Sequence, residues 1–337
     1  MAELIDKSLN FFKKEIIFSI SLILAIISCF FVQPSINYLS YINWDTIILL
    51  FVIMVIVEVL KNLSIFEILV RKLLAKIGNT RGLVLVLVFI CFFSSIFITN
   101  DVSLIIFVPF SILALKKVNR IDLTIVTVSL QTIAANVGCM VFPIGAPHNI
   151  VMYTISKIPF ESFFLLLLPY TIVSVIFLII CLFFIPKDVI VLPKMNKIEF
   201  DRKNFFKRVF LGVDYYLLLT FIVLFILIGN LENIAFFNSL FKKLILGNEV
   251  LWGIVASQVI SNVPAAMLLS GFSTNYEAII IGINIGGLGS LIASMANLIS
   301  YKILVREYDE FKIRYLIVFT VLNVILLASL VGVYIIN

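Results

Sequence analysis

The sequence predicts an all-α polytopic membrane protein built from two inverted repeats, and three observations support this fold class. First, 62% of the 337 residues are hydrophobic and only 13% are charged, whereas a soluble domain would carry roughly 25% charged residues. Second, uncharged runs such as 163–185, 278–301 and 315–336 are long enough to cross a hydrocarbon core, which takes about 20 helical residues. Third, similar helix-breaking motifs occur once in each half of the chain.

Charge and cysteine content argue against several other classes of protein. The net charge of +6 fits basic loops at a membrane surface, and no basic patch interleaved with aromatic residues indicates nucleic-acid binding. The four cysteines lie in apolar segments without CxxC spacing, which argues against a disulfide framework or a zinc site. No HExxH, GxSxG or paired catalytic aspartates occur, so we do not expect an enzyme.

Two helices and an interfacial segment open the first repeat, which we assign to residues 1–185. Apolar runs predict transmembrane helices over 16–32 and 45–60. No small-residue cleavage site follows the first run, so we expect a retained helix rather than a signal peptide. The segment from Ile65 to Ile77 places basic side chains beside an apolar face, which is typical of a helix in the membrane interface.

A re-entrant helical hairpin is predicted over 82–115, with its tip at Thr99-Asn100-Asp101. The polar tip interrupts an apolar run, and the second arm, 102–115, is too short to span the bilayer comfortably. Non-helical backbone at membrane depth is tolerated only where protein or a polar cavity covers it. A hairpin therefore fits this stretch better than two full spans.

A broken helix is predicted over 122–156, where the stretch Phe142-Pro143-Ile144-Gly145-Ala146-Pro147 interrupts an apolar run. Because Gly and Pro permit unwinding, we expect a helix to about 141, an unwound loop, and a half-helix from about 148. A helix over 160–185 closes the first repeat. A basic stretch, 186–208, follows as a cytoplasmic linker between the halves.

The second repeat, assigned to residues 209–337, follows the same plan with one helix fewer. Its predicted elements are a helix over 213–230, an interfacial segment over 233–246, a hairpin over 249–273 with its tip at Ser261-Asn262-Val263-Pro264, a broken helix over 277–301 interrupted at Gly286-Gly287-Leu288-Gly289, and a helix over 313–336. The layout predicts the same local chemistry in both halves.

The distribution of basic residues predicts the orientation. Counting crossings places the N-terminus, the linker and the segments 61–81, 116–120 and 302–314 on one face, which holds all but three of the 25 Lys and Arg residues. The remaining three are Lys157, Lys242 and Lys243. The positive-inside rule makes the basic face cytoplasmic. We therefore expect a cell-membrane protein (plasma or inner membrane) with its N-terminus inside, its C-terminus outside and its hairpins entering from opposite sides.

The internal repeat is the main indication of function. Each hairpin tip pairs a hydroxyl residue with Asn, and each following helix carries Asn-Val/Ile-Gly and a further Asn 13 positions later. Inverted repeats with broken helices indicate a transporter with a midplane binding site. Half-helix N-termini near 102, 148, 264 and 290 would favour an anion, and the carbonyl ends of the preceding half-helices could hold Na⁺.

Candidate substrate- and ion-binding residues lie at the tips and breaks, where Asn, Ser and Thr can satisfy freed backbone groups. They are Thr99, Asn100, Asp101, Asn136, Gly138, Pro143, Gly145, Pro147, His148, Asn149, Ser261, Asn262, Val263, Pro264, Asn284, Gly286, Gly289, Ser294 and Asn297. Two subsets could bind Na⁺: Thr99, Asn100, Asp101 and Gly145, and Ser261, Asn262 and Gly289. For the asparagines the alternative role is interhelical hydrogen bonding.

Three residues have competing interpretations. Asp101 is the only acidic residue predicted deep in the membrane, which indicates function, either cation coupling or a neutral substrate; it could also serve as an N-cap for residues 102–115. His148, the only histidine, could carry a proton or hydrogen-bond the unwound backbone. Cys139 is explained by packing more simply than by arsenite ligation.

Four segments, TNDVSLIIFVP, ANVGCMVFPIGAPHN, SQVISNVPAAML and NIGGLGSLIASMANLISYK, resemble signature segments of the ion transporter superfamily. This group includes the arsenite permease ArsB, NhaD antiporters, citrate transporter-like proteins and divalent anion:sodium symporters. The resemblance covers roughly residues 40–335 and implies a mobile transport domain of hairpins and broken helices, a scaffold, usually a dimer, and elevator-type alternating access. Dicarboxylate symporters carry Ser-Asn-Thr at both tips; here Asp101 and Val263 replace the threonine, which favours the ArsB-like and uncharacterised anion-permease branches.

The prediction is an ion-coupled secondary transporter that carries a small anionic or oxyanion solute across the lipid bilayer, as a homodimer, with no cofactor beyond Na⁺ or H⁺ as the coupling ion. An arsenite or antimonite efflux permease, an NhaD-type Na⁺/H⁺ antiporter and a dicarboxylate or citrate symporter stay open as alternatives. An anion channel is the alternative from a different class.

Overall fold

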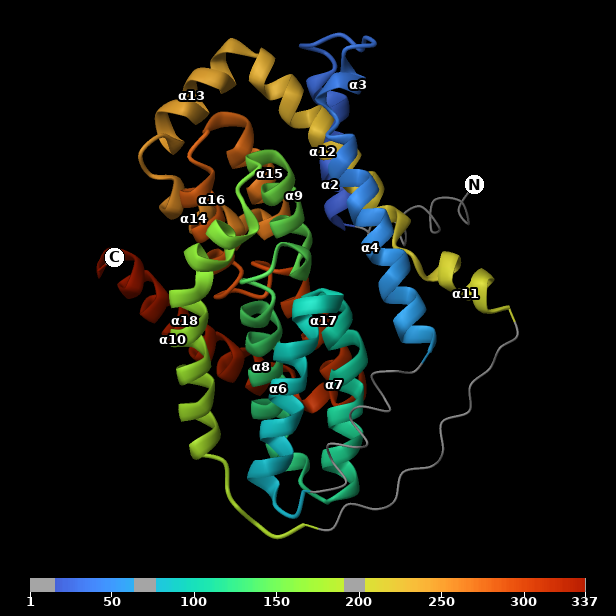
Figure 1. Ribbon diagram of the computed structural model, residues 1–337, viewed down its shortest axis with the longest axis vertical. Coiled ribbons are helices and arrows are strands. Elements are labelled where there is room, and N and C mark those ends of the chain that lie inside the picture. The colour runs from blue at the N-terminus through green and yellow to red at the C-terminus, as the bar shows by residue number, and fades with distance from the viewer. Residues whose placement is uncertain (1–15, 64–76, 191–203, 337) are drawn as a thin grey trace.

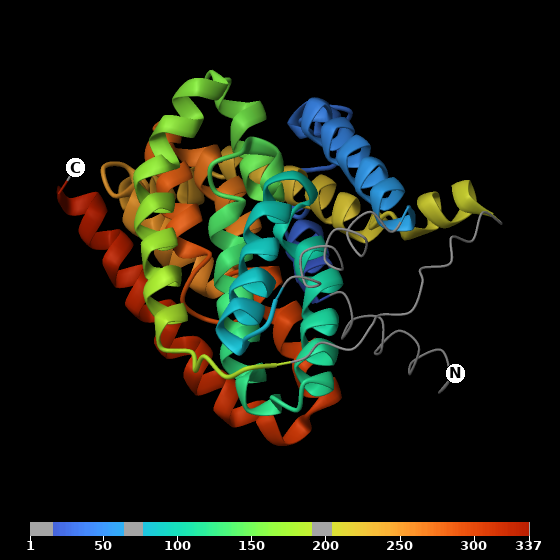
Figure 2. The ribbon, with the colours of Figure 1, turned by 60° about the horizontal axis from the view of Figure 1, so that its bottom comes forward.

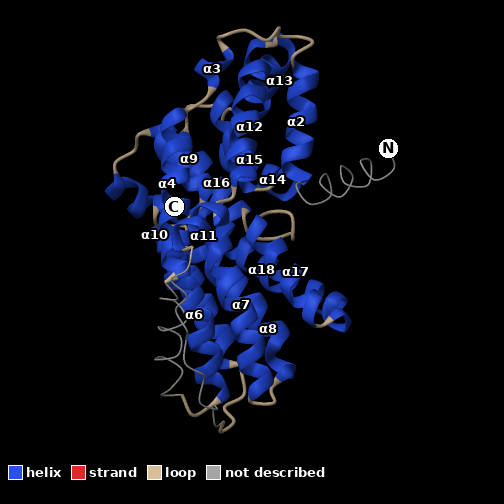
Figure 3. Cartoon of the chain, turned by 90° about the vertical axis from the view of Figure 1, so that its right-hand side faces the viewer, coloured by secondary structure: helices blue, strands red, loops and turns tan. Residues whose placement is uncertain are grey.

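The computed structural model describes residues 16–63, 77–190 and 204–336, which form helices joined by short loops (Figure 1). Within these ranges no β-strand forms, and one isolated bridge pairs Asn79 with Val189 (Figure 3). Among the described residues, five helices are long and apolar enough to cross a membrane, or six when α13 (Ala235–Ile245) and α14 (Glu249–Ile260), bent by 114°, count as one span. The protein is an all-helical polytopic membrane protein, as predicted.

The first half of the chain follows the predicted order. Its elements are α2 (Ile16–Ser28), α3 (Tyr38–Tyr41), α4 (Trp44–Asn62), α6 (Thr80–Ile98), α7 (Asn100–Lys117), η1 (Ile121–Leu123), α8 (Thr124–Gly138), η2 (Pro143–Gly145), α9 (Pro147–Ser156) and α10 (Phe160–Phe183). The helix predicted over 16–32 ends at Ser28, four residues early. The predicted interfacial segment, apart from Ile77, lies outside the described residues.

The second arm of the first hairpin is longer than predicted. Helix α7 has 18 residues, against 19 in α6, because helical backbone resumes directly after Thr99. It also continues past Pro109, which lies inside the helix. The arm is therefore not short, and its three charged residues, Asp101, Lys116 and Lys117, rather than its length, distinguish it from a full span.

The second half contains α11 (Phe205–Gly212), α12 (Tyr215–Asn233), α13, α14, α15 (Asn262–Phe272), α16 (Tyr276–Gly286), α17 (Met295–Glu307), η3 (Asp309–Phe311) and α18 (Lys312–Ile336). Helix α11 takes up the end of the predicted linker. The half-helix predicted near 290 begins at Met295 instead, because the glycine- and serine-rich stretch before it stays unwound, with Gly289 at φ +107° and Ser294 extended.

Helices α4 and α12 begin in the same way, and each has 19 residues. The Asn43 side chain accepts a hydrogen bond from the Thr46 backbone N–H at 3.0 Å, and Asp214 accepts one from the Leu217 N–H at 3.0 Å. Both are N-caps that satisfy a free amide of the first turn. Asp214 therefore caps α12.

Two hydrophobic cores divide the helices into two groups. The larger core is formed almost entirely by α6–α10 and α14–α18, which we call the core bundle. The smaller core joins α2, α4 and α12 to one face of α9 and of α15. Helices α2, α4, α11 and α12, the lateral helices, stand at the upper right of Figure 1, and α10 and α18 line the opposite side of the core bundle (Figure 2).

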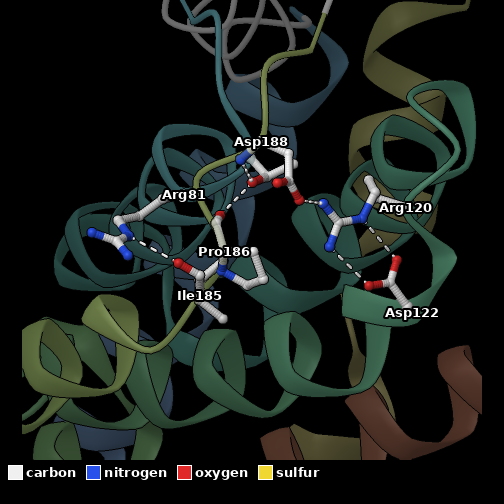
Figure 4. A network of polar contacts seen from close by, with 7 residues as sticks. Arg81, Arg120, Asp122, Ile185, Pro186 and Asp188 are labelled. Carbon is white, nitrogen blue, oxygen red and sulfur yellow. Dashed lines mark hydrogen bonds and ion pairs between the residues drawn. The ribbon is translucent and has the colours of Figure 1, made fainter.

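A polar network ties the start of the linker to the base of the first hairpin (Figure 4). Arg120 binds both carboxylate oxygens of Asp122, with both N–O distances at 2.9 Å, and also pairs with Asp188. Arg81 donates to the Ile185 carbonyl at 2.9 Å. The linker therefore leaves the core bundle from a defined point, beside the turn between α7 and α8.

Candidate functional site

The two hairpin tips share a rare backbone conformation. Thr99 lies at φ 66° and ψ 150°, and Ser261 lies at φ 73° and ψ 154°. Residues with side chains seldom occupy this region, and holding one there costs about 1–3 kcal/mol. Each tip is followed at once by an asparagine that begins the second arm, Asn100 or Asn262. The same strain at the same place in both halves indicates that the tip geometry itself has a function.

The two helix breaks also have the same shape. The residue that follows the helix before each break, Cys139 or Gly287, still has helical backbone angles, and the residue that precedes the helix after the break, Ala146 or Ser294, is extended. Cys139 and Gly287 are separated by the same number of residues as Ala146 and Ser294, and as the repeated asparagines Asn136 and Asn284. The interval also places the start of α17 at Met295, which corresponds to Pro147 at the start of α9.

In each half, the second asparagine of the motif hydrogen-bonds a backbone carbonyl at the helix break of its own repeat. Asn149 donates from Nδ2 to the Cys139 carbonyl at 3.0 Å, and Asn297 donates to the Gly287 carbonyl at 3.1 Å. Each carbonyl sits at the end of a helix, where no helical N–H is available. These two amides therefore satisfy backbone groups that neither water nor lipid could reach, since both side chains are fully buried.

Side-chain hydrogen bonds connect the asparagines of the two halves. Asn136 on α8 donates from Nδ2 to Asn297 Oδ1 at 2.7 Å, and Asn284 on α16 donates from Nδ2 to Asn149 Oδ1 at 2.8 Å. Each bond joins the first half of one broken helix to the second half of the other. The four predicted asparagines thus form one symmetric arrangement at the centre of the core bundle.

The surroundings of the two pairs differ. Asn136 Oδ1 accepts from Asn100 Nδ2 at 3.0 Å and from Ser294 Oγ at 3.3 Å. Asn284 Oδ1 instead lies 3.3 Å from His148 Nε2. Alanine stands at the corresponding positions of the other repeat: Ala146 corresponds to Ser294, and Ala296 corresponds to His148. His148 is therefore held by a side chain of the other repeat rather than by unwound backbone.

A glycine after each central asparagine allows close helix packing. A Cβ on Gly138 would lie 2.1 Å from the Phe92 carbonyl oxygen and 2.5 Å from Ser95 Oγ on α6. A Cβ on Gly286 would lie 2.8 Å from Ser257 Oγ on α14. The predicted site residues Gly138 and Gly286 therefore allow each broken helix to pack closely against the first arm of its hairpin.

The tip of the first hairpin carries oxygen atoms without partners. Asn100 Oδ1 and Asp101 Oδ1 are buried and accept no hydrogen bond from the described residues. Helix α7 begins at Asn100, so Asp101 lies in its first turn, and the expectation that Asp101 is an N-cap is wrong. Amide and carboxylate oxygens are the donors that a hard cation prefers, whereas within the described residues no cluster of three His, Cys, Asp or Glu side chains could hold a metal ion.

The remaining predicted residues lie beside the breaks or turn away from them. Pro143 and Gly145 form η2, and Pro147 begins α9. Pro264 is the third residue of α15. Val263, in contrast, packs in the smaller core against the lateral helices. The backbone N–H of Asn262 donates to the Ala293 carbonyl at 2.9 Å, which holds the second tip against the second break.

Sequence reasoning missed Gln258 on α14. Its Nε2 donates to the carbonyls of Gly286 and Leu288 at 2.7 and 2.8 Å, and its Oε1 accepts from the Ser290 N–H at 2.8 Å. The same Oε1 would lie 2.6 Å from a Cβ on Gly289. One side chain therefore organises the whole second break. Its counterpart in the first half is Ile96, so only its polarity within an apolar arm could have indicated it.

Comparison with known proteins places these features in a family context. Residues 4–276 match the citrate transporter family CitMHS. The chain is 33% identical over 299 residues to the uncharacterized transporter MJ0456 of Methanocaldococcus jannaschii, a stretch that covers 78% of this chain and 81% of that protein. It is 28% identical over 299 residues to the inner membrane protein YbiR of Escherichia coli, covering 77% and 80%. A Dictyostelium discoideum protein named as the transporter arsB is 32% identical over 128 residues, covering 37% and 22%.

Proposed function

Because the chain belongs to the citrate transporter family, we propose that it is an ion-coupled secondary transporter that carries a small anion by elevator-type alternating access. The family and the relatives make it a multi-pass membrane transporter. The observation that carries the finer proposal is the pair of crossed asparagine bonds between the two repeats, Asn136 with Asn297 and Asn284 with Asn149.

The half-helices support an anionic substrate. Asn100, Asn149, Asn262 and Asn297 lie in the first turns of α7, α9, α15 and α17. Hydrogen bonds connect these first turns to the two helix breaks, so amide side chains gather beside the N-terminal ends of four helices. Each such end carries a partial positive charge and free N–H groups. Because amides rather than basic side chains surround this point, the anion would be bound mainly by dipoles and hydrogen bonds.

The asymmetry of the tips supports coupling to a cation at the first hairpin. Only this tip carries a carboxylate, and Asn100 Oδ1 and Asp101 Oδ1 both accept no hydrogen bond from the described residues. Ionisable residues at membrane depth are costly unless they are paired or functional. A Na⁺ or a proton at Asp101 would remove this cost and would also reduce repulsion between the carboxylate and an anionic substrate.

The two faces of the core bundle support alternating access. On α15, Met267 is buried against the lateral helices, and a Cβ on Gly271 would lie 2.6 Å from Ile228 on α12. Their counterparts on α7, counted from the tips, are Ile105, which is 44% exposed, and Pro109, which lines an open groove. One of two equivalent faces is thus covered and the other is open, as expected if the core bundle docks on the lateral helices in two positions.

The experiment that tests this proposal is counterflow in proteoliposomes. A thermal-shift screen of citrate, dicarboxylates, other oxyanions and arsenite, with Na⁺ or choline, would first select a substrate. We expect saturable exchange of that labelled substrate, accelerated by unlabelled substrate on the opposite side. Electrodiffusive flux without exchange would assign the chain to the channels instead, and Na⁺ movement driven by a pH gradient with no anion present would favour the antiporter alternative.

A further inference from the structure

An open groove lies between α7 and α17 at the end of the core bundle that is predicted to face the cytoplasm. These helices pack side by side, and the groove has a volume of about 470 Å³, within the ~300–1,000 Å³ typical of ligand pockets. Its walls include the apolar side chains Pro109, Leu113 and Ile303, and its rim carries the charged side chains Lys116, Arg306 and Glu307. The groove is separate from the asparagine cluster.

The depth of the groove in the bilayer follows from helix geometry. With the tip at the midplane and a rise of 1.5 Å per residue, Pro109 lies about 14 Å and Lys116 about 24 Å from the midplane. The hydrocarbon core ends at about 15 Å and the headgroup region at about 22 Å. The apolar walls therefore begin at the level of the acyl chains. The backbone of the charged rim lies just outside the headgroup region, from which long basic side chains can reach the phosphates.

The charge of the rim favours an anionic occupant. Lys116 Nζ lies 3.6 Å from Glu307 Oε1, so these two charges offset one another in part. Arg306 is exposed and makes no ion pair with any other described residue, which leaves its planar guanidinium available for a phosphate. The rim therefore has a net positive charge. The basic segment 65–76 carries Arg71, Lys72 and Lys76, so like charges disfavour it as an occupant.

We propose that this groove binds one anionic phospholipid, with its phosphate on Arg306 and Lys116 and an acyl chain along Pro109, Leu113 and Ile303. A free phosphate would satisfy the rim but would leave the apolar walls uncovered. A zwitterionic lipid would cover the walls but would bring a cation to a positive rim. This inference rests on the groove and its depth alone and does not depend on the proposed transport activity.

Fluorescence quenching by brominated lipids tests the proposal on the full chain. Leu113, which is 48% exposed, is replaced by Trp in a background where Trp44 and Trp252 are Phe, and the protein is reconstituted with brominated phosphatidylglycerol or phosphatidylcholine. A basic side chain near the bilayer surface strengthens binding of an anionic lipid about five-fold. We expect a several-fold preference for phosphatidylglycerol that Arg306→Gln and Lys116→Gln each reduce about five-fold.

Two further variants distinguish a specific loss of lipid preference from misfolding. Glu307→Gln removes the competing carboxylate and is expected to increase the preference, which a damaged fold would not do. Lys242→Gln removes one basic side chain on α13, at the other end of the molecule, and is expected to change nothing. Equal quenching by the two lipids, or a preference unaffected by Arg306→Gln and Glu307→Gln, would overturn the proposal. Loss of the preference with millimolar inorganic phosphate would also overturn it, by assigning the rim to a free anion.

Discussion

Replacement of Asn136 by alanine tests the crossed arrangement most directly. The side chain makes three hydrogen bonds, to Asn100, Ser294 and Asn297, and all three partners are buried. A hydrogen bond between membrane helices contributes about 0.6 kcal/mol on average and about 1.7 kcal/mol at most. Three such bonds amount to about 2 kcal/mol, and the small cavity left by the amide adds to this.

Asn323 provides a matched control. It is as completely buried as Asn297, but its Nδ2 donates only to the Phe319 carbonyl of its own helix, at 2.9 Å, and its Oδ1 has no partner among the described residues. Asn323→Ala therefore removes an unsatisfied buried acceptor together with one weak local bond, so we expect almost no change in the free energy of unfolding. The difference between the two variants isolates the bonds between repeats.

Thermal unfolding in detergent and substrate counterflow measure the effect. For a chain of this size, about 2 kcal/mol corresponds to a decrease in Tm of roughly 4 °C, and we expect counterflow to fall at least ten-fold because the tip and the break lose their common anchor. Asn136→Asp distinguishes loss of the hydrogen bond from loss of side-chain volume. It keeps the size of the side chain but replaces the Nδ2 donor with an oxygen, which faces Asn297 Oδ1 and cannot donate to it. Equal stability of Asn136→Ala and Asn323→Ala, with counterflow intact, would refute the reasoning.

Three other substitutions follow from the same geometry. Gly138→Ala should destabilise the protein by about 1–3 kcal/mol through overpacking, whereas Gly332→Ala, with open space around its Cβ, should be neutral or stabilising; equal Tm values would contradict the close packing. Ser261→Gly should be about 1 kcal/mol more stable than Ser261→Ala, because glycine relieves the positive φ while both lose the hydroxyl; chemical denaturation compares them. Asp101→Asn should abolish the Na⁺ or pH dependence of counterflow, and an unchanged dependence would remove Asp101 from the coupling role.

The local features of the fold were largely predictable from the sequence. Low charge and long apolar runs identify the membrane protein, and a polar tip within an apolar run locates each hairpin, because these signals lie in contiguous residues. The exception is the start of α17. Composition suggested about 290, but the repeat interval from Pro147 points to Met295, where the helix begins. The interval was the better guide because both breaks need the same length of unwound chain.

The sequence by itself determined which asparagines and glycines recur, and hence where polar groups and close contacts would be needed. Only the tertiary structure decided how they pair. The bonds from Asn136 to Asn297 and from Asn284 to Asn149 join residues 161 and 135 positions apart, and the spacing within each repeat is equally compatible with pairing inside a repeat. The choice depends on how four half-helices pack, because a buried amide must find its partner in whichever helix the packing brings within reach.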